Sequence, residues 1–207
     1  MALDVGVLVS GRGSNLEAIL RSIRDGTLTG VRVAVVISSS AGVRAVDVAK
    51  GYGVEAEVFD VASLHLKRPE YDRLLVGCLK KHGIGPSAGL VVLAGYDRIL
   101  SSEFVREFSG RLINIHPALL PSFKGLHAQK QALDFGAKVS GCTVHFVVPE
   151  VDAGPVIAQK AVEVLEGDDE EALSERILKE EHRLLPRAVQ LFADGRLKMD
   201  GRRVVVS

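Results

Sequence analysis

The chain has few cysteines, no excess of charge of either sign and no long hydrophobic run. Its 207 residues include 26 basic and 26 acidic side chains, whereas nucleic-acid and membrane surfaces usually show a basic excess. No apolar run reaches the ~18 residues of a membrane-spanning helix, and the first residues lack the charged and apolar regions of a signal peptide. We therefore expect a soluble cytoplasmic protein without nucleic-acid or membrane partners.

The two cysteines, Cys78 and Cys142, lie far apart in the sequence. Neither belongs to a C-x-x-C pair, the spacing that zinc sites and redox motifs commonly use, and two lone thiols suit a reducing compartment. The sequence therefore predicts no metal site.

Short runs rich in Val, Ile and Leu alternate with helical patterns over the first half of the chain. The expected strands are 5–9, 31–37, 56–59, 90–93 and 112–115. The expected helices are 15–25, 43–52, 70–82 and 102–108. This alternation predicts an α/β fold with a doubly wound, mostly parallel sheet that helices cover on both faces.

The pattern changes after a further expected helix at 129–135. Expected strands at 143–148 and 156–164 are separated by a gap too short for a crossover helix, so we expect them to be antiparallel. A long helix at about 170–192 follows, and residues 196–206 read as a hairpin that turns at Asp200-Gly201. With no internal repeat and no linker, we expect one domain over residues 1–207, with an antiparallel C-terminal portion.

Asn114 and His116 stand at the end of an apolar strand that Pro117 terminates. Because they are two residues apart, their side chains leave the same face of the strand. An amide that donates hydrogen bonds and an imidazole that titrates near neutral pH suit a reaction in which an oxyanion forms and a proton moves. The structural alternative is that the pair only caps the strand.

The first strand runs into Ser10-Gly-Arg-Gly-Ser-Asn15, just before a helix. Glycines let the backbone approach a ligand, and the start of a helix offers free N–H groups to an anion. The loop is neither G-x-G-x-x-G nor a P-loop, so a phosphate monoester fits better than a dinucleotide. The alternatives are a simple tight turn, or capping of the helix by Ser14 or Asn15.

Two further segments carry candidate charges. Arg98 follows the fourth strand, where open α/β sheets bind ligands, and is suited either to binding an acid or to a place on the surface. Asp152 precedes Gly154-Pro155, a turn that can require only an Asx bond. If that turn folds back over the sheet, Asp152 can lie beside His116 and favour its charged form.

Taken together, these segments resemble the phosphoribosylglycinamide formyltransferase (glycinamide ribonucleotide transformylase) family of folate-dependent formyltransferases. The matching motifs, which follow the family order along nearly the whole chain, are Ser10-Gly-Arg-Gly-Ser-Asn15, Leu93-Ala-Gly-Tyr-Asp-Arg-Ile-Leu100, Asn114-Ile-His-Pro-Ala-Leu-Leu-Pro-Ser-Phe-Lys-Gly125, His127-Ala-Gln-Lys-Gln-Ala132, Gly141-Cys-Thr-Val-His145, Asp152-Ala-Gly-Pro155, Glu181-His182 and Phe192-Ala-Asp-Gly-Arg-Leu197.

The resemblance implies a Rossmann-like transferase of purine (IMP) biosynthesis that moves the formyl group of 10-formyltetrahydrofolate to the amine of 5′-phosphoribosylglycinamide, without a metal. Its catalytic residues would be Asn114, His116 and Asp152. Asn114 and protonated His116 would stabilise the oxyanion, and Asp152 would keep His116 protonated and help to carry the amine proton.

The resemblance also implies the binding residues. Those for phosphoribosylglycinamide are Gly13, Ser14, Asn15 and Glu181. Those for the folate are Arg68, Arg98, Ile99, Leu100, Asn114, Val148, Pro149, Glu150, Val151 and Asp152. Two positions depart from the family pattern: Asp97 stands where an apolar residue is common, and Gln129 stands where a histidine is frequent.

Three rival functions share features with this pattern. A formyltetrahydrofolate deformylase uses a similar trio but usually carries an N-terminal regulatory domain, and this chain starts at its first strand. A methionyl-tRNA formyltransferase has a further RNA-binding domain. A non-catalytic module that binds folate or phosphate would have no chemical need for all three residues. We therefore expect the protein to be a formyltransferase that is a monomer or a homodimer.

Overall fold

A computed structural model describes residues 2–207 of the chain. By their contacts they divide into an N-terminal unit, which ends at Asn114, and a C-terminal unit, which begins at Ile115. A single domain over residues 1–207 therefore stays a prediction.

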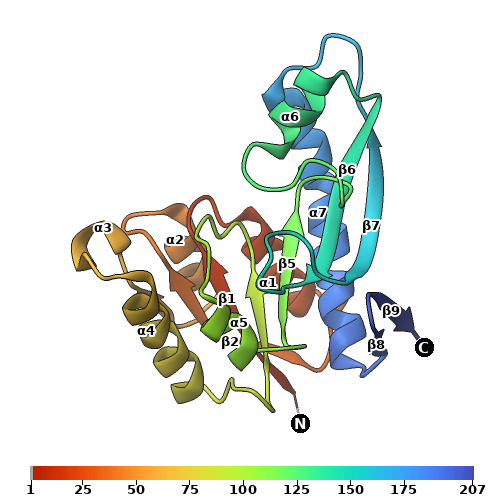
Figure 1. The fold of residues 1–207 in the computed structure, drawn as a ribbon. Helices are drawn as coiled ribbons and strands as arrows, with labels where there is room; N and C mark the ends of the chain where they lie inside the picture. The colour runs from red at the N-terminus through yellow and green to blue at the C-terminus, as the bar shows by residue number, and fades with distance from the viewer. Residues whose placement is uncertain (1) are drawn as a thin grey trace. The chain divides into compact units, whose positions relative to one another are not determined.

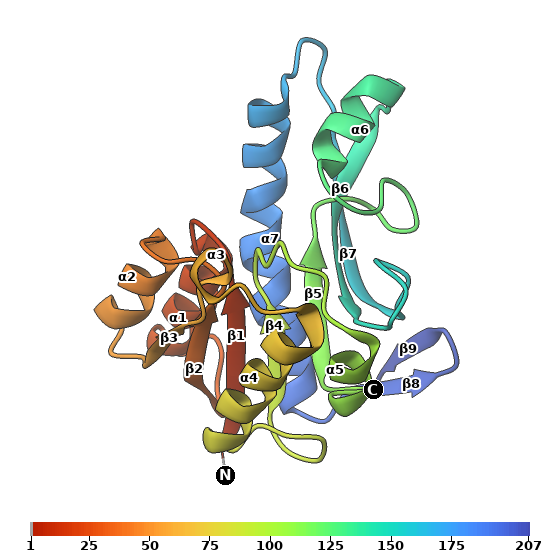
Figure 2. The same ribbon diagram turned by 60° about the vertical axis from the view of Figure 1, so that its left-hand side comes forward.

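Five strands form the sheet of the N-terminal unit (Figures 1 and 2). They are β1 (Leu3–Val9), β2 (Val31–Ser38), β3 (Ala56–Val58), β4 (Leu90–Leu93) and β5 (Leu112–His116), which continues for two residues into the C-terminal unit. Their order is β3-β2-β1-β4-β5 and each neighbouring pair is parallel. The chain reverses its winding direction between β1 and β4, and ligands bind at such a switch point in open α/β sheets.

Helices cover both faces of this sheet. They are α1 (Ser14–Arg24), α2 (Arg44–Gly51), α3 (Val61–Leu64), α4 (Arg68–Lys81) and α5 (Ser102–Glu107). α1 packs against α2 on one face and α4 packs against α5 on the other (Figures 1 and 2). The four-residue helix α3 was not predicted, because one turn is too short to show a period in the sequence.

The C-terminal unit consists of two hairpins and two helices. Its elements are α6 (Ala128–Phe135), β6 (Val139–Phe146), β7 (Val156–Glu163), α7 (Glu170–Ala193), β8 (Leu197–Asp200) and β9 (Arg203–Val206). Both β6–β7 and β8–β9 are antiparallel, as predicted. α7 packs along β6 and β7 (Figure 1), and Asp169 caps its start by accepting the Ala172 N–H at 2.8 Å. The predicted fold class, mostly parallel with an antiparallel C-terminal portion, is confirmed.

The bounds predicted for β6 were wrong. The strand begins at Val139 instead of residue 143 and ends at Phe146 instead of residue 148. A glycine inside a strand usually weakens it, but here a Cβ on Gly141 would lie 2.0 Å from the carbonyl oxygen of Lys160. Glycine at this position therefore permits β7 to approach closely, and the strand extends through it.

A helix needs about 20 mostly apolar residues to span a bilayer. None of the helices in residues 2–207 is long and apolar enough to span a membrane.

Candidate active site

Strand β5 presents Asn114 and His116 on one face, because successive strand side chains alternate. Asn114 is partly buried, whereas His116 is only 4% exposed. The polar pair therefore ends a strand whose other residues are apolar and buried.

Within the C-terminal unit, both ring nitrogens of His116 face oxygen atoms. Nε2 lies 2.8 Å from the carbonyl oxygen of Phe123, and Nδ1 lies 3.3 Å from Oδ2 of Asp152. A carbonyl oxygen only accepts hydrogen bonds, so Nε2 is the nitrogen that carries the proton in the neutral ring. Nδ1 is then the basic atom, and it faces a carboxylate.

Asp152 lies where the conditional prediction put it, beside His116. Its backbone adopts the left-handed region (φ 49°), which Asp tolerates better than most residues. Its Oδ2 accepts the N–H of Gly125 at 2.8 Å, and its Oδ1 lies 3.5 Å from Nε2 of His145. The side chain thus ties the turn to a loop 27 residues away, instead of serving only its own turn through an Asx bond.

The two central groups have perturbed pKa values. Burial lowers the pKa of His116, and the Asp152 carboxylate and the Phe123 carbonyl only partly oppose this effect. Burial raises the pKa of Asp152, but hydrogen bonds from His145 and Gly125 and the nearby imidazoles outweigh it, so the net pKa is lowered. Asp152 therefore raises the pKa of His116, as expected, but burial lowers it by more, and the net pKa lies below its ordinary value.

Gly154 allows the turn that carries Asp152 to lie against β6. A Cβ at this position would lie 1.7 Å from the carbonyl oxygen of Phe146 and 3.5 Å from Nδ1 of His145. Nδ1 of His145 in turn lies 2.9 Å from that same carbonyl oxygen, which accepts its proton. This contact fixes the ring so that Nε2 points to Asp152.

Thr143 holds the segment that leads from β5 towards Phe123. Its hydroxyl donates to the carbonyl oxygen of Ala118 at 2.7 Å and accepts the N–H of Leu120 at 3.1 Å. Gln159 donates to both the Thr143 hydroxyl and the Leu120 carbonyl. The approach of this segment to His116 is therefore fixed by buried hydrogen bonds.

The residues that sequence reasoning missed act mainly through the backbone. Phe123 contributes a carbonyl oxygen and Gly125 an N–H, and neither function depends on a side chain. The only sequence feature that points to these two residues is the turn-like segment Ser122-Phe-Lys-Gly125. In the sequence His145 is marked only as the last residue of the motif Gly141-Cys-Thr-Val-His145, and its 3.5 Å contact with Asp152 makes it a partner of the site.

In the N-terminal unit, the loop from Ser10 to Asn15 leads directly into α1, which begins at Ser14. Gly13 is the N-cap residue in the left-handed region (φ 74°), so neither Ser14 nor Asn15 caps the helix, and that alternative is wrong. A Cβ on Gly13 would lie 2.6 Å from Cα of Ala45. The glycine is thus required for packing as well as for backbone conformation, and a phosphate role stays a prediction.

The loop after β4 lies beside the loop after β1. Ser10 donates its N–H to the Gly95 carbonyl at 3.0 Å, and its hydroxyl accepts the N–H of Asp97 at 3.0 Å. The loop ends at Ser101, whose N–H donates to the buried carboxylate of Asp72 at 2.7 Å. Both ends of the segment that carries Arg98 are therefore anchored, and the Asp97 side chain is exposed.

The remaining predicted binding residues are distributed over both units. Ile99 is 57% exposed, Arg68 is exposed at the start of α4, and Glu181 is buried in α7. Residues 148–151 lie between β6 and β7, where Glu150 pairs with Lys124 at 3.4 Å. Within the C-terminal unit the structure brings His116 and Asp152 together, with His145 as a third member, and within the N-terminal unit it brings together the loops after β1 and β4.

Known proteins similar to this chain show its family. The family model described as "Formyl transferase" matches residues 3–189. The chain is 42% identical to phosphoribosylglycinamide formyltransferase of Escherichia coli (strain K12), covering 95% of this chain and 90% of the relative. It matches the structure of glycinamide ribonucleotide transformylase 1 from Symbiobacterium toebii with a TM-score of 0.94 and 49% identity, covering 99% of this chain and 94% of the other.

Some relatives are much longer than this chain. The trifunctional purine biosynthetic protein adenosine-3 of Bos taurus is 44% identical over 94% of the chain, which spans only 19% of that relative. The E. coli relative, by contrast, is matched over most of its own length. Since the family model also covers most of the chain, the chain belongs to the formyl transferase family.

Proposed function

We propose that the protein transfers the formyl group of 10-formyltetrahydrofolate to the amine of 5′-phosphoribosylglycinamide, in de novo purine synthesis. The observation that carries this proposal is the buried imidazole of His116, which lies 3.3 Å from the carboxylate of Asp152 at the end of the strand that also presents Asn114. The names of the relatives supply the substrate, and the His116–Asp152 pair supports the chemistry.

Attack of the neutral amine on the formyl carbon forms a C–N bond and leaves negative charge on the formyl oxygen. The Asn114 amide is suited to donate to this oxyanion, and one such donor contributes about 3–4 kcal/mol in other enzymes. Nε2–H of His116 is a second donor, but the Phe123 carbonyl accepts it in this structure. That carbonyl must therefore move away before Nε2–H can reach substrate.

The amine must then lose a proton, and the folate nitrogen must gain one as its bond to the formyl carbon breaks. Once the Phe123 carbonyl has moved away, the proton of the neutral ring can shift to Nδ1, where Asp152 accepts it. Nε2 then accepts the proton that the amine loses and passes it to the folate nitrogen, so the proton count balances. Asp152 stabilises the imidazolium that exists between these two transfers, as the buried carboxylate does in a catalytic triad. Asp152 thus acts on the charged intermediate state of His116, not on the resting ring.

The binding assignments follow the family motifs and are part of the proposal. Gly13, Ser14 and Asn15 would bind the phosphate, because they stand at the start of α1, where the helix dipole favours an anion. Glu181 would bind the glycinamide end. Arg68, the loop residues 98–100 and the turn residues 148–152 would contact the folate.

The test is an absorbance assay of folate product from 10-formyltetrahydrofolate, with and without 5′-phosphoribosylglycinamide. Product only with the acceptor supports the transferase. Equal product without the acceptor means a deformylase, and binding without turnover means a non-catalytic module. We expect His116→Ala to lower turnover at least ~100-fold, which is within the range for loss of a catalytic proton carrier. His65→Asn, at an exposed left-handed position, is the matched histidine control and should leave turnover unchanged.

A further inference from the structure

The last turn of α4 brings a thiol and an imidazole against strand β3. Cys78 and His82 are four residues apart, so they lie on the same side of the helix end. Glu57 projects from β3, and one ligand atom from each of Glu57, Cys78 and His82 lies within 4.8 Å of the other two. These three residues, here called the α4–β3 cluster, are the one such group of metal-binding side chains found in residues 2–207.

Ordinary packing leaves the imidazole of this cluster unexplained. The His82 side chain is only 12% exposed, and its Nε2 is fully buried without a hydrogen-bond partner in the part of the chain that the structure describes. Oε1 of Glu55 lies 3.7 Å from it, beyond hydrogen-bond distance. Buried polar atoms in native proteins are normally satisfied, so this ring nitrogen, beside a thiol and two carboxylates, is suited to bind a ligand.

The charges around the cluster favour a cation. Glu55 and Glu57 contribute two carboxylates, and the only cation that faces them in the described structure is Lys81. Its Nζ lies 3.9 Å from Glu55 and 3.8 Å from Glu57, and its side chain is 66% exposed. Exposed pairs at such distances contribute little, so Lys81 can withdraw to solvent when a cation binds the carboxylate.

The ligand types decide which cation fits. Sulfur and imidazole nitrogen together select a borderline-soft metal of the zinc class, whereas calcium and magnesium require oxygen ligands. Zinc bonds of about 2.0–2.3 Å in tetrahedral geometry separate the ligand atoms by about 3.3–3.8 Å. The cluster would therefore contract by at most about 1.0–1.5 Å on binding, which small side-chain rotations can supply.

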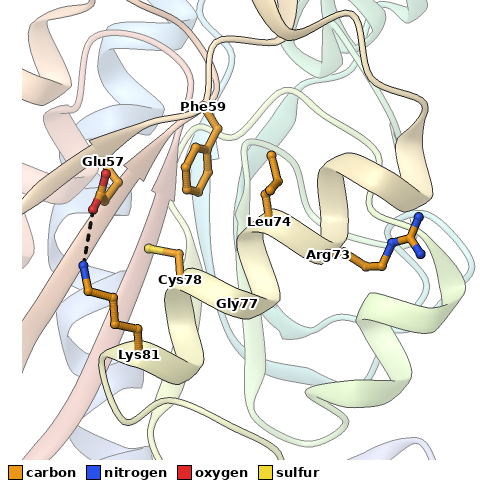
Figure 3. Close-up of a pocket in the computed structure, with 7 residues that line it drawn as sticks. All are labelled: Glu57, Phe59, Arg73, Leu74, Gly77, Cys78 and Lys81. Carbon is orange, nitrogen blue, oxygen red and sulfur yellow. Dashed lines mark ion pairs between the residues drawn. The ribbon is translucent and has the colours of Figure 1, made fainter.

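A pocket gives the cation a route to the cluster. Glu57 and Cys78 line a cavity of about 340 Å³ between α4 and β3. Figure 3 shows the Cys78 sulfur pointing from α4 towards the strand that carries Glu57, with Lys81 one turn further along the helix. Water in this cavity can complete the coordination, as at zinc sites with three protein ligands.

We propose that Glu57, Cys78 and His82 form a binding site for a zinc-class divalent cation, with solvent as the fourth ligand. The sequence predicted no metal site, because neither cysteine belongs to a C-x-x-C pair. Here the third ligand, Glu57, comes from strand β3, 21 residues before Cys78 in sequence. The bound ion joins α4 to β3 and stabilises the folded protein. The inference does not depend on the proposed function.

The test is titration of the metal-free, reduced protein with Co²⁺, a spectroscopic substitute for Zn²⁺. A site with a thiolate ligand gives a sulfur-to-cobalt charge-transfer absorption, and we expect it at one ion per chain. An ion at the His116–Asp152 cluster has no sulfur ligand and gives no such band. Absence of the band in the wild-type protein at saturating Co²⁺ would overturn the proposal.

Variants identify the ligands. We expect Cys78→Ser to abolish the band, and both Cys78→Ser and His82→Gln to weaken Zn²⁺ binding at least ~100-fold, since even outer-sphere partners of zinc are worth 10- to 100-fold. Cys142→Ala removes the other thiol and should keep the band. Melting curves without metal show whether each variant is folded, and Zn²⁺ should raise Tm only where the site is intact. A band that survives Cys78→Ser, or unchanged Zn²⁺ affinity in folded His82→Gln, refutes the assignment.

Discussion

Replacement of Asp152 by asparagine removes one negative charge from the active site with little change in shape. Asparagine tolerates the left-handed backbone of this position (φ 49°). Its side-chain oxygen can still accept the Gly125 N–H that the carboxylate accepts at 2.8 Å. The variant therefore isolates the effect of the charge on His116.

The size of the effect follows from the 3.3 Å separation between Nδ1 of His116 and Oδ2 of Asp152. Coulomb's law at an effective dielectric constant of about 20 gives an upper limit of about 5 kcal/mol. Carboxylates at such distances usually shift a partner's pKa by about 1–3 units, and one unit corresponds to about 1.4 kcal/mol. Asp152 raises the pKa of His116 against the larger effect of burial, so its removal lowers that pKa further.

Two measurements check this expectation. NMR titration of the His116 imidazole should give a pKa below about 6.5 in the wild type and a value about 1–3 units lower in Asp152→Asn. The acid limb of the kcat/KM profile should move to lower pH in the same direction. Turnover at neutral pH should fall about 10- to 1000-fold, because the imidazolium loses its counter-charge.

Asp134→Asn is the matched control. Asp134 is an exposed carboxylate on α6 that pairs with Lys130 at 2.8 Å, so its loss should leave the pKa of His116 unchanged. Identical imidazole pKa values in the wild type and Asp152→Asn would refute the coupling between His116 and Asp152. A rise in the His116 pKa in Asp152→Asn would refute the direction of the expected change.

Three further predictions follow from the site and its scaffold. Asn114→Ala should lower kcat at least ~100-fold with the melting temperature preserved; near-normal turnover would remove the amide from the mechanism. Gly154→Ala should destabilise the protein by about 1–3 kcal/mol or more, because the new Cβ would lie 1.7 Å from the Phe146 carbonyl oxygen. Gly51→Ala is its control, because a Cβ at that helix position meets no atom within 4 Å. Equal urea midpoints for Gly154→Ala and the wild type would contradict the reasoning. The hydrogen-bonded guanidinium of Arg176 lowers the pKa of the Asp168 carboxyl to about 2. This ion pair therefore stabilises the folded protein above the unfolded-state pKa of about 3.9, and the stabilisation is lost as the pH falls towards 2. The Tm difference between wild type and Asp168→Asn should therefore shrink over that range, and a constant difference would argue against it.

The sequence by itself determined the layers of the fold and the residues on its reactive strand. Apolar runs with a strand period alternated with helical patterns, and this local information placed β1, β2, β4 and β5 within a few residues. It also placed Asn114 and His116 on one strand face, because alternation is a property of every strand. Strand β6 was displaced in the prediction because only contact with Lys160 shows why Gly141 belongs to it.

Only the tertiary structure decided the chemical state of the site. The contacts of His116 with the Phe123 carbonyl and of Gly125 with Asp152 are made by backbone atoms, which every residue possesses and no sequence motif distinguishes. The direction of the His116 pKa depends on burial, which is set by packing of distant segments and outweighs the carboxylate that the motif revealed. The α4–β3 cluster likewise exists only because folding brings a strand against a helix end. Local periodicity depends on neighbouring residues in the sequence. Desolvation and long-range hydrogen bonding arise only when remote parts of the chain pack together and exclude water.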